Sequence, residues 1–388
     1  MKDNALAAFI SMRIAASPAA GWRFDAQGVK HTERCVSFRE YMSDCLYHPE
    51  YGYYRTGVIR IGKAGDFYTS SGIGRILAEV LARYLNEFVQ AAPEGWNPLQ
   101  LIEWGAGTGR LSAQIAAAGS RLSGNWNERF LPVLIEDHPK HAAAARESFK
   151  SEALLPSPVI VSSEEAWSAD WLGHPSIILA NELFDAFPVH RIQRLNGELV
   201  ELGVAGDVER GLYEVFMPLT EPRIGGWLER DGIRLIEGQK TEVHAEAADF
   251  LEKLAKRMTK GRLVLIDYGH EAAEYTAEHR MLGTLMCYWR HQASDSPYER
   301  IGRQDITSHV PFTFIQQTAA ESGWRMVSYS SQKQFLMDNG VLEMLQNHNG
   351  SDPFGEAART NRAVRQLLLS DQMSEAFKVM VLEKDNSL

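Results

Sequence analysis

The sequence predicts an α/β fold with a doubly wound, parallel sheet. Short apolar runs alternate with helical patterns in the middle of the chain. Continuous Val, Ile and Leu runs bounded by turns are typical of strands that are buried on both faces, with helices outside. A glycine-rich turn also joins the first run to a helical segment. The expected strands span residues 99–102, 130–135, 158–161, 176–180 and 262–266, with helices between them at 109–118, 139–150, 163–168 and 244–258.

The residues before this core predict a helical N-terminal cap, residues 1–95. Residues 1–16 carry an amphipathic pattern. Ser37 and Glu40 have the spacing of a capping box, which begins a second helix. A longer apolar face runs over residues 73–88 and predicts a third helix.

Residues 96–388 predict the core, with an inserted β-rich and helical segment on the substrate side at about 190–312. Within it, Asn196-Gly197 is placed as a hairpin turn between two alternating runs. Residues 270–312 show no regular pattern, so they are expected to be irregular. Two further strands are expected at 324–330 and 377–382.

Charge and cysteine content argue against several classes of function. The net charge of −10 disfavours a nucleic-acid or membrane-surface binder, because such proteins usually carry a basic patch. The three cysteines form no Cys-x-x-Cys pair, and the N-terminus lacks the apolar core of a signal peptide. No apolar run is long enough to insert into a membrane, and no ligand pair has metal-binding spacing. We expect a cytoplasmic protein; its oligomeric state is not predicted.

The glycine turn predicts a nucleotide-like cofactor. Gly105, Gly107 and Gly109 let the backbone turn sharply and leave room for a ligand against bare peptide groups. A dinucleotide site favours Gly or Ala where Arg110 stands, and an acid about twenty residues further on. Glu136, which ends the second strand, lies 31 residues after Gly105. This spacing disfavours NAD without excluding it. It suits S-adenosylmethionine (SAM), whose ribose hydroxyls need an acid after the second strand.

Polar residues after two later strands are candidates for catalysis. Asn181, Glu182 and Asp185 follow the fourth strand, and ligands of such sheets lie outside the carboxyl ends of the strands. This loop should therefore face the glycine turn, where an amide and two carboxylates could orient a nucleophile. His270 follows the fifth strand and could act as a general base. The structural alternatives are a helix cap for the loop and an exposed position for the histidine.

A second loop, residues 65–70, lies outside the predicted core. Its acid Asp66 and its hydroxyl residue Thr69 could fold over the cofactor as a lid. A turn followed by a helix cap is the plainer interpretation.

Several stretches occur in an order that is typical of one family. They are Tyr41–Tyr54 (YMSDCLYHPEYGYY), Gly65–Ser70 (GDFYTS), Glu103–Gly109 (EWGAGTG), Asn181–Pro188 (NELFDAFP), Ile266–His270 (IDYGH), Gly283–His291 and Gln304–His309 (QDITSH). Together they resemble the MidA-like family of class I SAM-dependent methyltransferases. Its mitochondrial members serve as complex I assembly factors and are protein arginine methyltransferases.

The resemblance implies a seven-stranded methyltransferase core with a reversed last strand. It also implies SAM at the glycine turn, with Glu136 on the ribose. The residues predicted to bind the cofactor are Glu103, Gly105, Ala106, Gly107, Gly109, Glu136, Asn181 and Thr69, and those predicted to serve catalysis are Glu182, Asp185, Asp66 and His270. The chain departs from the family pattern at Trp104, at Ser71-Gly72 and at Pro311-Phe312.

Three functions stay open from the sequence. The first is SAM-dependent methylation of a protein, with arginine as a possible acceptor. Carboxylates would then hold the guanidinium group of that arginine. The second is O- or N-methylation of a small molecule, where an alcohol or phenol would need a base such as His270 or His309. The third is a non-catalytic assembly factor that keeps the methyltransferase fold.

Overall fold

A computed structural model of the chain describes residues 5–56, 71–91, 96, 98–152, 154, 156–168, 170–347, 352, 354–369 and 375–385. Its contacts divide the chain into two compact units. Unit 1 contains Met1–Val58, Phe184–Phe250 and Gly269–Thr318, and unit 2 contains Ile59–Leu183, Leu251–Tyr268 and Ala319–Leu388. Each unit is therefore built from segments that are far apart in the sequence.

Unit 2 contains the predicted sheet, in the order β17-β18-β12-β7-β4-β5-β6. The central strand β4 pairs in parallel with β5 and with β7. Strand β18 runs antiparallel to both of its neighbours, which confirms the seven-stranded core with a reversed last strand. The strands are β4 (Leu99–Trp104), β5 (Phe130–Ile135), β6 (Val159–Val161), β7 (Ser176–Asn181), β12 (Lys260–His270), β17 (Arg325–Ser331) and β18 (Phe377–Asp385).

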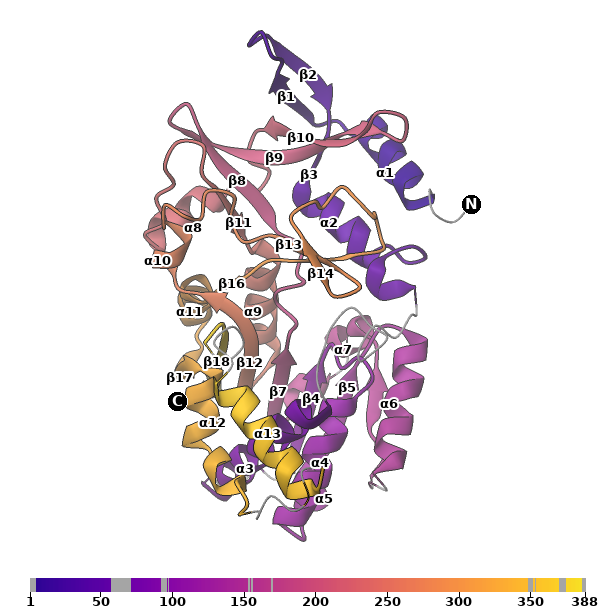
Figure 1. Ribbon diagram of the computed structural model, residues 1–388, viewed down its shortest axis with the longest axis vertical. Helices are drawn as coiled ribbons and strands as arrows, with labels where there is room; N and C mark the ends of the chain where they lie inside the picture. Colours follow the sequence, from indigo (N-terminus) through magenta and orange to yellow (C-terminus); the bar gives the residue numbers. More distant parts are fainter. Residues whose placement is uncertain are drawn as a thin grey trace. The chain divides into compact units, whose positions relative to one another are not determined.

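Helices cover this sheet, and α3 packs against both α4 and α13 (Figure 1). Every residue of β4 is buried, as expected for a parallel strand covered on both faces. One large apolar core joins Leu99 and Leu101 of β4 to Ile115 of α4 and Val264 of β12. The helical elements are α3 (Ser71–Ala91), α4 (Arg110–Leu122), α5 (Trp126–Arg129), α6 (Pro139–Ser151), α7 (Ser163–Ser168), η3 (Asp170–Gly173), α12 (Gln332–Asp338), η4 (Val341–Met344) and α13 (Glu356–Leu369).

Unit 1 contains an antiparallel sheet in the order β11-β8-β9-β10-β1-β2, with β3 paired to β9. Asn196 and Gly197, with φ of 51° and 83°, form the predicted hairpin turn between β8 and β9. The hairpin of β1 and β2 was not predicted. The strands are β1 (Ala20–Phe24), β2 (Lys30–Arg34), β3 (Val36–Ser37), β8 (His190–Leu195), β9 (Glu198–Asp207), β10 (Gly211–Met217) and β11 (Lys240–Val243).

The remaining elements of unit 1 are mostly short. Helix α2 begins with the predicted capping box, in which Ser37 and Glu40 each accept from the other's backbone N–H. The region 270–312, predicted to be irregular, contains a three-stranded sheet in the order β14-β13-β15. The helices are α1 (Ala5–Ala16), α2 (Phe38–Tyr47), η2 (Tyr53–Arg55), α8 (Ile224–Arg230) and α10 (Ala272–Tyr275), and the strands are β13 (Met286–Trp289), β14 (Gln292–Ser294), β15 (Asp305–Thr307) and β16 (Val310–Pro311). Helices α9 (Ala245–Arg257) and α11 (Phe312–Glu321) begin in unit 1 and end in unit 2. The last two residues of β12, Gly269 and His270, belong to unit 1, where they pair with β16.

The two units differ from the predicted division of the chain at residue 95. Helix α3, predicted in the N-terminal cap, belongs to unit 2. Its residues Val80, Leu81 and Leu85 are buried in the same core as Leu99 of the sheet. The first 58 residues join the inserted segment in unit 1, because the apolar faces of α1 and α2 pack with strand residues such as Val204.

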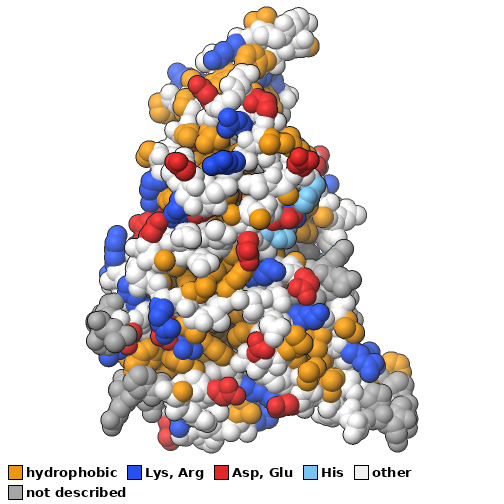
Figure 2. Space-filling model, turned by 90° about the vertical axis from the view of Figure 1, so that its left-hand side faces the viewer, with side chains coloured by type: hydrophobic (Ala, Val, Ile, Leu, Met, Phe, Trp, Pro, Cys, Tyr) orange, Lys and Arg blue, Asp and Glu red, His pale blue; other side chains and the backbone are white. Residues whose placement is uncertain are grey.

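Acidic and basic side chains are interspersed over the face of the molecule in Figure 2. Among the described helices, none has both the length and the hydropathy that a membrane-crossing segment needs. In the same part of the chain, no group of three or more His, Cys, Asp or Glu side chains is placed to hold a metal ion.

Candidate functional site

The glycine turn joins β4 to α4 in unit 2. Gly105, Gly107 and Gly109 have backbone φ angles of 72°, 54° and 61°. Residues that carry a Cβ rarely adopt such angles. A Cβ at Gly109 would lie only 2.7 Å from the Cβ of Ala145. The backbone N–H of Gly105 donates to the carbonyl of Ile135 at 3.0 Å, which ties the turn to the end of β5.

Glu136 follows β5 and binds the turn directly. Its Oε2 accepts from the backbone N–H of Gly107 at 2.8 Å, and its Oε1 accepts from that of His138 at 2.8 Å. These two bonds fix the carboxylate beside the glycines. A carboxylate offers about four acceptor positions, so Glu136 can still accept from ribose hydroxyls.

Glu103, the last acid before the turn, is buried beside the start of α4. Its Oε2 accepts from the backbone N–H of Ser112 at 3.2 Å, which holds the helix to the end of β4. Burial raises the pKa of Glu103 to about 7, and the negative charge of Glu136 adds to the effect. The site therefore contains one carboxyl group that changes charge near neutral pH.

The loop after β7 lies against the turn, as the sequence analysis expected. Ala180 of β7 is paired with Trp104 of β4, so the two strands end together. The Cδ1 atom of Leu183 would lie 3.0 Å from a Cβ placed on Gly105.

Glu182 is the residue of this loop with an unusual backbone. Its φ is 50°, a left-handed conformation that is uncommon outside glycine and clusters at functional sites. Its backbone N–H donates to the carbonyl of Ile266 in β12 at 2.9 Å. Asn181, at the end of β7, places its Nδ2 3.4 Å from Oε1 of Glu182. Glu182 and Asn181 are thus held at the junction of β7 and β12, next to the turn.

The other predicted site residues either lie outside the described residues or belong to unit 1. Asp66 and Thr69 lie outside the described residues. Asp185 and His270 belong to unit 1, whereas Glu103, Glu136, Asn181 and the turn with Ala106 belong to unit 2. Within unit 2, the structure therefore brings together the predicted cofactor residues from Glu103 to Asn181.

His270 has neighbours that weaken it as a general base. Its Nε2 lies 3.2 Å from Nη2 of Arg280, whose guanidinium can only donate. The lone pair that a base needs is therefore already accepting a hydrogen bond. The ring of His309 lies 4.9 Å away, and burial, followed by the electrostatic effects of its neighbours His270 and Arg280, lowers its pKa to about 4. Neither histidine is suited to take a proton from an alcohol.

Unit 1 gathers a set of residues that the sequence analysis did not assign, around Asp185. We call Tyr47, Tyr54, Asp185, Tyr288 and Asp305 the acidic–tyrosine cluster. The hydroxyl of Tyr54 lies 2.8 and 2.9 Å from the two carboxylate oxygens of Asp305, and its ring stacks on Tyr47 at 5.5 Å. Tyr47 donates to the carbonyl of Ala186 at 2.9 Å. The cluster thus combines carboxylates with aromatic faces.

Local folding explains how these residues meet. Tyr288 of β13 stands opposite Asp305 of β15 in antiparallel register. The backbone N–H of Ser308 donates to the carbonyl of Asp185 at 3.0 Å, which joins the loop after β7 to the end of β15. Asp185 and Asp305 are both buried. Burial raises the pKa of Tyr47 and Tyr54 well above their usual value, and the charges of Asp305 and Asp185 raise it further.

The sequence contained a partial signal for this cluster. Tyr47 and Tyr54 lie in the stretch Tyr41–Tyr54, and Asp305 lies in Gln304–His309, both of which carried the family resemblance. Their hydrogen bond joins residues 251 positions apart. No local pattern shows such a pairing, so the stretches could be noted but not assembled.

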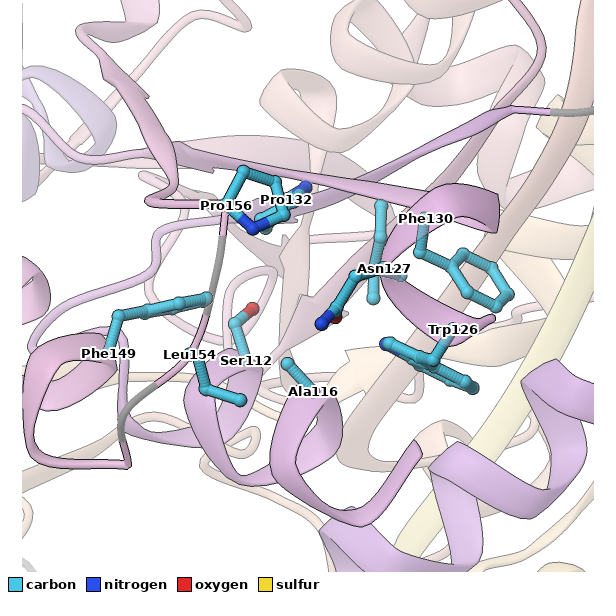
Figure 3. Close-up of a pocket in the computed structure, with 10 residues that line it drawn as sticks. Ser112, Ala116, Trp126, Asn127, Phe130, Pro132, Phe149, Leu154 and Pro156 are labelled. Atoms are coloured by element: carbon cyan, nitrogen blue, oxygen red, sulfur yellow. The ribbon is translucent and has the colours of Figure 1, made fainter. Parts of the chain in front are cut away.

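A separate small cavity lies within unit 2, among α4, α5, α6 and β5 (Figure 3). Its volume is about 10 Å³, which is room for one water molecule. Its walls are mostly apolar, with Trp126, Phe130 and Phe149 among them. It does not include the glycine turn or Glu136, and it is a packing defect rather than a cofactor pocket.

Comparison with known proteins identifies what the chain is similar to. Residues 80–330 match a family described as S-adenosyl-L-methionine-dependent methyltransferase. The protein arginine methyltransferase NDUFAF7, mitochondrial, of Danio rerio is 27% identical over 362 residues, which are 88% of this chain and 82% of that protein. The Mus musculus protein of the same name is 27% identical over 327 residues, which are 79% of this chain and 71% of that protein.

The same comparison extends to solved structures. A COG1565 superfamily member from Burkholderia thailandensis, bound to S-adenosyl-homocysteine, has a TM-score of 0.84 and 28% sequence identity. The match covers 99% of this chain and 92% of that one. A native structure of a COG1565 superfamily protein from the same organism gives a TM-score of 0.81 at 27% identity, with the same coverage.

Proposed function

The chain belongs to the MidA-like family of SAM-dependent methyltransferases, and from this premise we propose that it methylates a side-chain nitrogen of a protein, with arginine as the acceptor. The methyltransferase activity and the cofactor follow from the family. The nature of the acceptor is the proposal.

The residues of unit 2 fit the cofactor. When bound, SAM supplies a methyl group on a sulfonium centre. The glycine turn would hold its amino-acid end against bare backbone, because Gly105, Gly107 and Gly109 carry no side chains. Glu136 would accept from the ribose hydroxyls, since its carboxylate is already fixed by Gly107 and His138. Holding the donor in one orientation is most of what such a transfer requires of an enzyme.

The acidic–tyrosine cluster is the observation that carries the proposal for the acceptor. Buried carboxylates accept hydrogen bonds from a guanidinium, and tyrosine faces attract a cation. Asp185 and Asp305 would supply the carboxylates, and the aromatic faces would come from Tyr47, Tyr54 and Tyr288. Burial, and then the charges of Asp185 and Asp305, raise the pKa of Tyr288. Tyr288 and the two acids therefore influence one another electrostatically. The relatives named protein arginine methyltransferase support the same acceptor.

O-methylation of a small molecule is the weaker candidate. An alcohol or phenol must lose its proton during transfer, which calls for a positioned base. The lone pair of His270 accepts from Arg280, and His309 has a pKa of about 4. Methylation of an arginine nitrogen also releases one proton, and the carboxylates of Asp185 and Asp305 would both orient the guanidinium and accept that proton as the N–C bond forms.

The experiment supplies the full chain with methyl-labelled SAM and a set of arginine peptides. Matched peptides carry citrulline, lysine or tyrosine at the same position. Label on arginine nitrogen, located by mass spectrometry, is the expected result. Label only on lysine, on tyrosine oxygen or on small metabolites would contradict the proposal.

A variant links the acceptor to the cluster. Asp305→Asn should lower kcat/KM for the arginine peptide about tenfold or more, because it removes one carboxylate charge, and should leave the affinity for SAM unchanged. Tyr213→Phe is the matched control, since Tyr213 also bonds an acid, Glu33, in unit 1 but outside the cluster.

The cytoplasmic location expected from the sequence stays a prediction.

A further inference from the structure

We propose that unit 1 carries a second binding site, for a guanidinium or ammonium group, in a cavity beside the pair His190 and Glu201. The cavity has a volume of about 380 Å³. None of its lining residues belongs to the glycine turn or to the acidic–tyrosine cluster, so the inference does not rest on the proposed acceptor. The lining residues are Ser37, Arg39, Glu40, His190, Thr220, Glu221, Ala245 and Asp249.

His190 presents a hydrogen-bond acceptor to this cavity. The residue is only 5% exposed, and its Nδ1 lies 2.7 Å from Oε1 of Glu201, which is 0% exposed. The other oxygen of Glu201 accepts from the backbone N–H and the hydroxyl of Thr220, at 2.6 and 2.8 Å. With Nδ1 donating to Glu201, Nε2 is the ring nitrogen that is left to bond a ligand. Among the described residues, no group hydrogen-bonds Nε2.

The ion pairs around the cavity leave an excess of negative charge. In the described residues, three guanidinium groups are shared among five carboxylates. Arg13 pairs with Glu40 and Asp44, Arg39 with Glu246, and Arg223 with Glu221 and Asp249. Glu201, bonded to His190, is a sixth carboxylate. A cation with N–H donors would balance this charge and satisfy Nε2.

An anion fits the same cavity poorly. Arg39 is the cation in its lining, and its guanidinium is paired with Glu246. The N-terminus of α2 also borders the cavity, and there the capping box already occupies the backbone N–H groups of Ser37 and Glu40. The carboxylates of Glu221 and Asp249 line the same space, and their negative charge would repel a phosphate.

The ligand chemistry could come from two sources. A basic side chain of a bound protein and a small free amine both supply N–H donors with a positive charge. The volume of about 380 Å³ is within the range of pockets for small organic ligands. Both sources would contact the same acceptors, so one set of titrations separates them.

The test titrates the full chain with four probes and follows binding by calorimetry. The probes are agmatine, the peptide acetyl-Gly-Arg-Gly-amide, its citrulline counterpart, and inorganic phosphate. We expect agmatine or the arginine peptide to bind, and the tighter of the two identifies the source. The citrulline peptide has nearly the same shape without the charge and should bind at least tenfold more weakly. Binding of phosphate, or equal binding of the citrulline peptide, would overturn the proposal.

Variants test whether the probe binds in this cavity. Asp249→Asn should weaken the cation about tenfold, because it removes one charge, while Asp207→Asn, an exposed acid of β9 paired with Arg210, should not. His190→Phe tests Nε2 directly. If that variant fails to fold, the ring nitrogen signals of ¹⁵N-labelled histidine in the unaltered chain give the same answer. Nε2 of His190 should shift on titration with the cation, and an unmoved signal would contradict the site.

Discussion

The glycine turn of unit 2 and the acidic–tyrosine cluster of unit 1 hold their acids in different ways. The acids at the turn bond to backbone N–H groups, as Glu103 does to Ser112, nine residues away. In the cluster, an acid bonds to another side chain, as Asp305 does to Tyr54 across 251 residues. The first arrangement depends on the local course of the chain. The second depends on the whole unit being folded.

Under the proposed function, this difference corresponds to two tasks within one enzyme. A cofactor common to a family can be held by backbone geometry, which changes little when side chains change. An acceptor must be distinguished by side chains, and side chains stay in place when they are fixed by partners from other segments. We therefore expect backbone changes to harm cofactor binding most, and side-chain changes in unit 1 to alter the acceptor.

The largest effect is expected from Gly109→Ala in the turn. The new Cβ would lie 2.7 Å from the Cβ of Ala145, and the residue has a φ of 61°. Overpacking and backbone strain together should lower the free energy of unfolding by about 3 to 5 kcal/mol. Affinity for SAM should fall with it. Thermal unfolding and calorimetry with SAM measure the two effects.

Gly124→Ala is the matched control for this change. A Cβ at Gly124 would meet nothing within 4 Å, so stability and SAM affinity should both stay close to those of the unaltered chain. If Gly109→Ala bound SAM normally, the turn would not be the cofactor site, and the contrast between the units would lose its basis.

Glu103→Gln should produce the next largest effect, and its sign depends on pH. The folded pKa of Glu103 is about 7, against an ordinary value of 4.5, so the folded state holds the proton more tightly than the unfolded chain. Stability from this group is therefore full below pH 4.5 and is lost as pH rises toward 7. Removing the carboxylate should make the variant more stable at pH 8 by up to about 3 kcal/mol, with little change at pH 4.

Urea unfolding at a series of pH values measures this prediction. The variant keeps an oxygen that can accept from Ser112, so the helix start should be preserved. Glu128→Gln, an exposed acid of α5, is the control and should leave the pH profile unaltered. A parallel pH profile for Glu103→Gln and the unaltered chain would mean that Glu103 does not titrate near pH 7.

The contrast also explains what the sequence could predict. The strands of unit 2, the turn and Glu136 were predictable, because apolar runs and glycine spacing are local signals. The hairpin at Asn196 and the capping box at Ser37 were predictable for the same reason. The three-stranded sheet of β13, β14 and β15 was not, since strands of three or four residues are too short to show an alternation.

Contacts between segments that are distant in the sequence account for the features that could not be predicted. His270 was predicted as a base from its position after a strand, but the donor that occupies its lone pair, Arg280, lies in a segment without regular structure. The contacts of α3 place it in unit 2. Its amphipathic pattern could not indicate this, because such a pattern shows that a helix face is buried without showing what covers it.

Tyr54→Phe tests the side-chain arrangement of unit 1 directly. It removes the hydroxyl that lies 2.8 Å from Asp305, while the ring can still stack on Tyr47. Loss of this charge-assisted bond should cost about 2 kcal/mol of stability. It should also lower kcat/KM for the acceptor, and it should leave SAM affinity unchanged. Reduced SAM affinity without any change toward the acceptor would reverse the roles given to the two units.

The smallest effect is expected at the β8–β9 hairpin, where unit 1 does depend on local backbone. Gly197 has a φ of 83° and open space around it, so Gly197→Ala meets strain without a collision. Strain alone should lower the free energy of unfolding by about 1 kcal/mol. This loss is well below that expected at Gly109, where a positive φ is combined with tight packing. Comparing the two variants by thermal unfolding isolates the contribution of packing. Equal losses would show that conformation alone makes the turn of unit 2 intolerant, and the close contact with Ala145 would then carry no weight in holding the cofactor site.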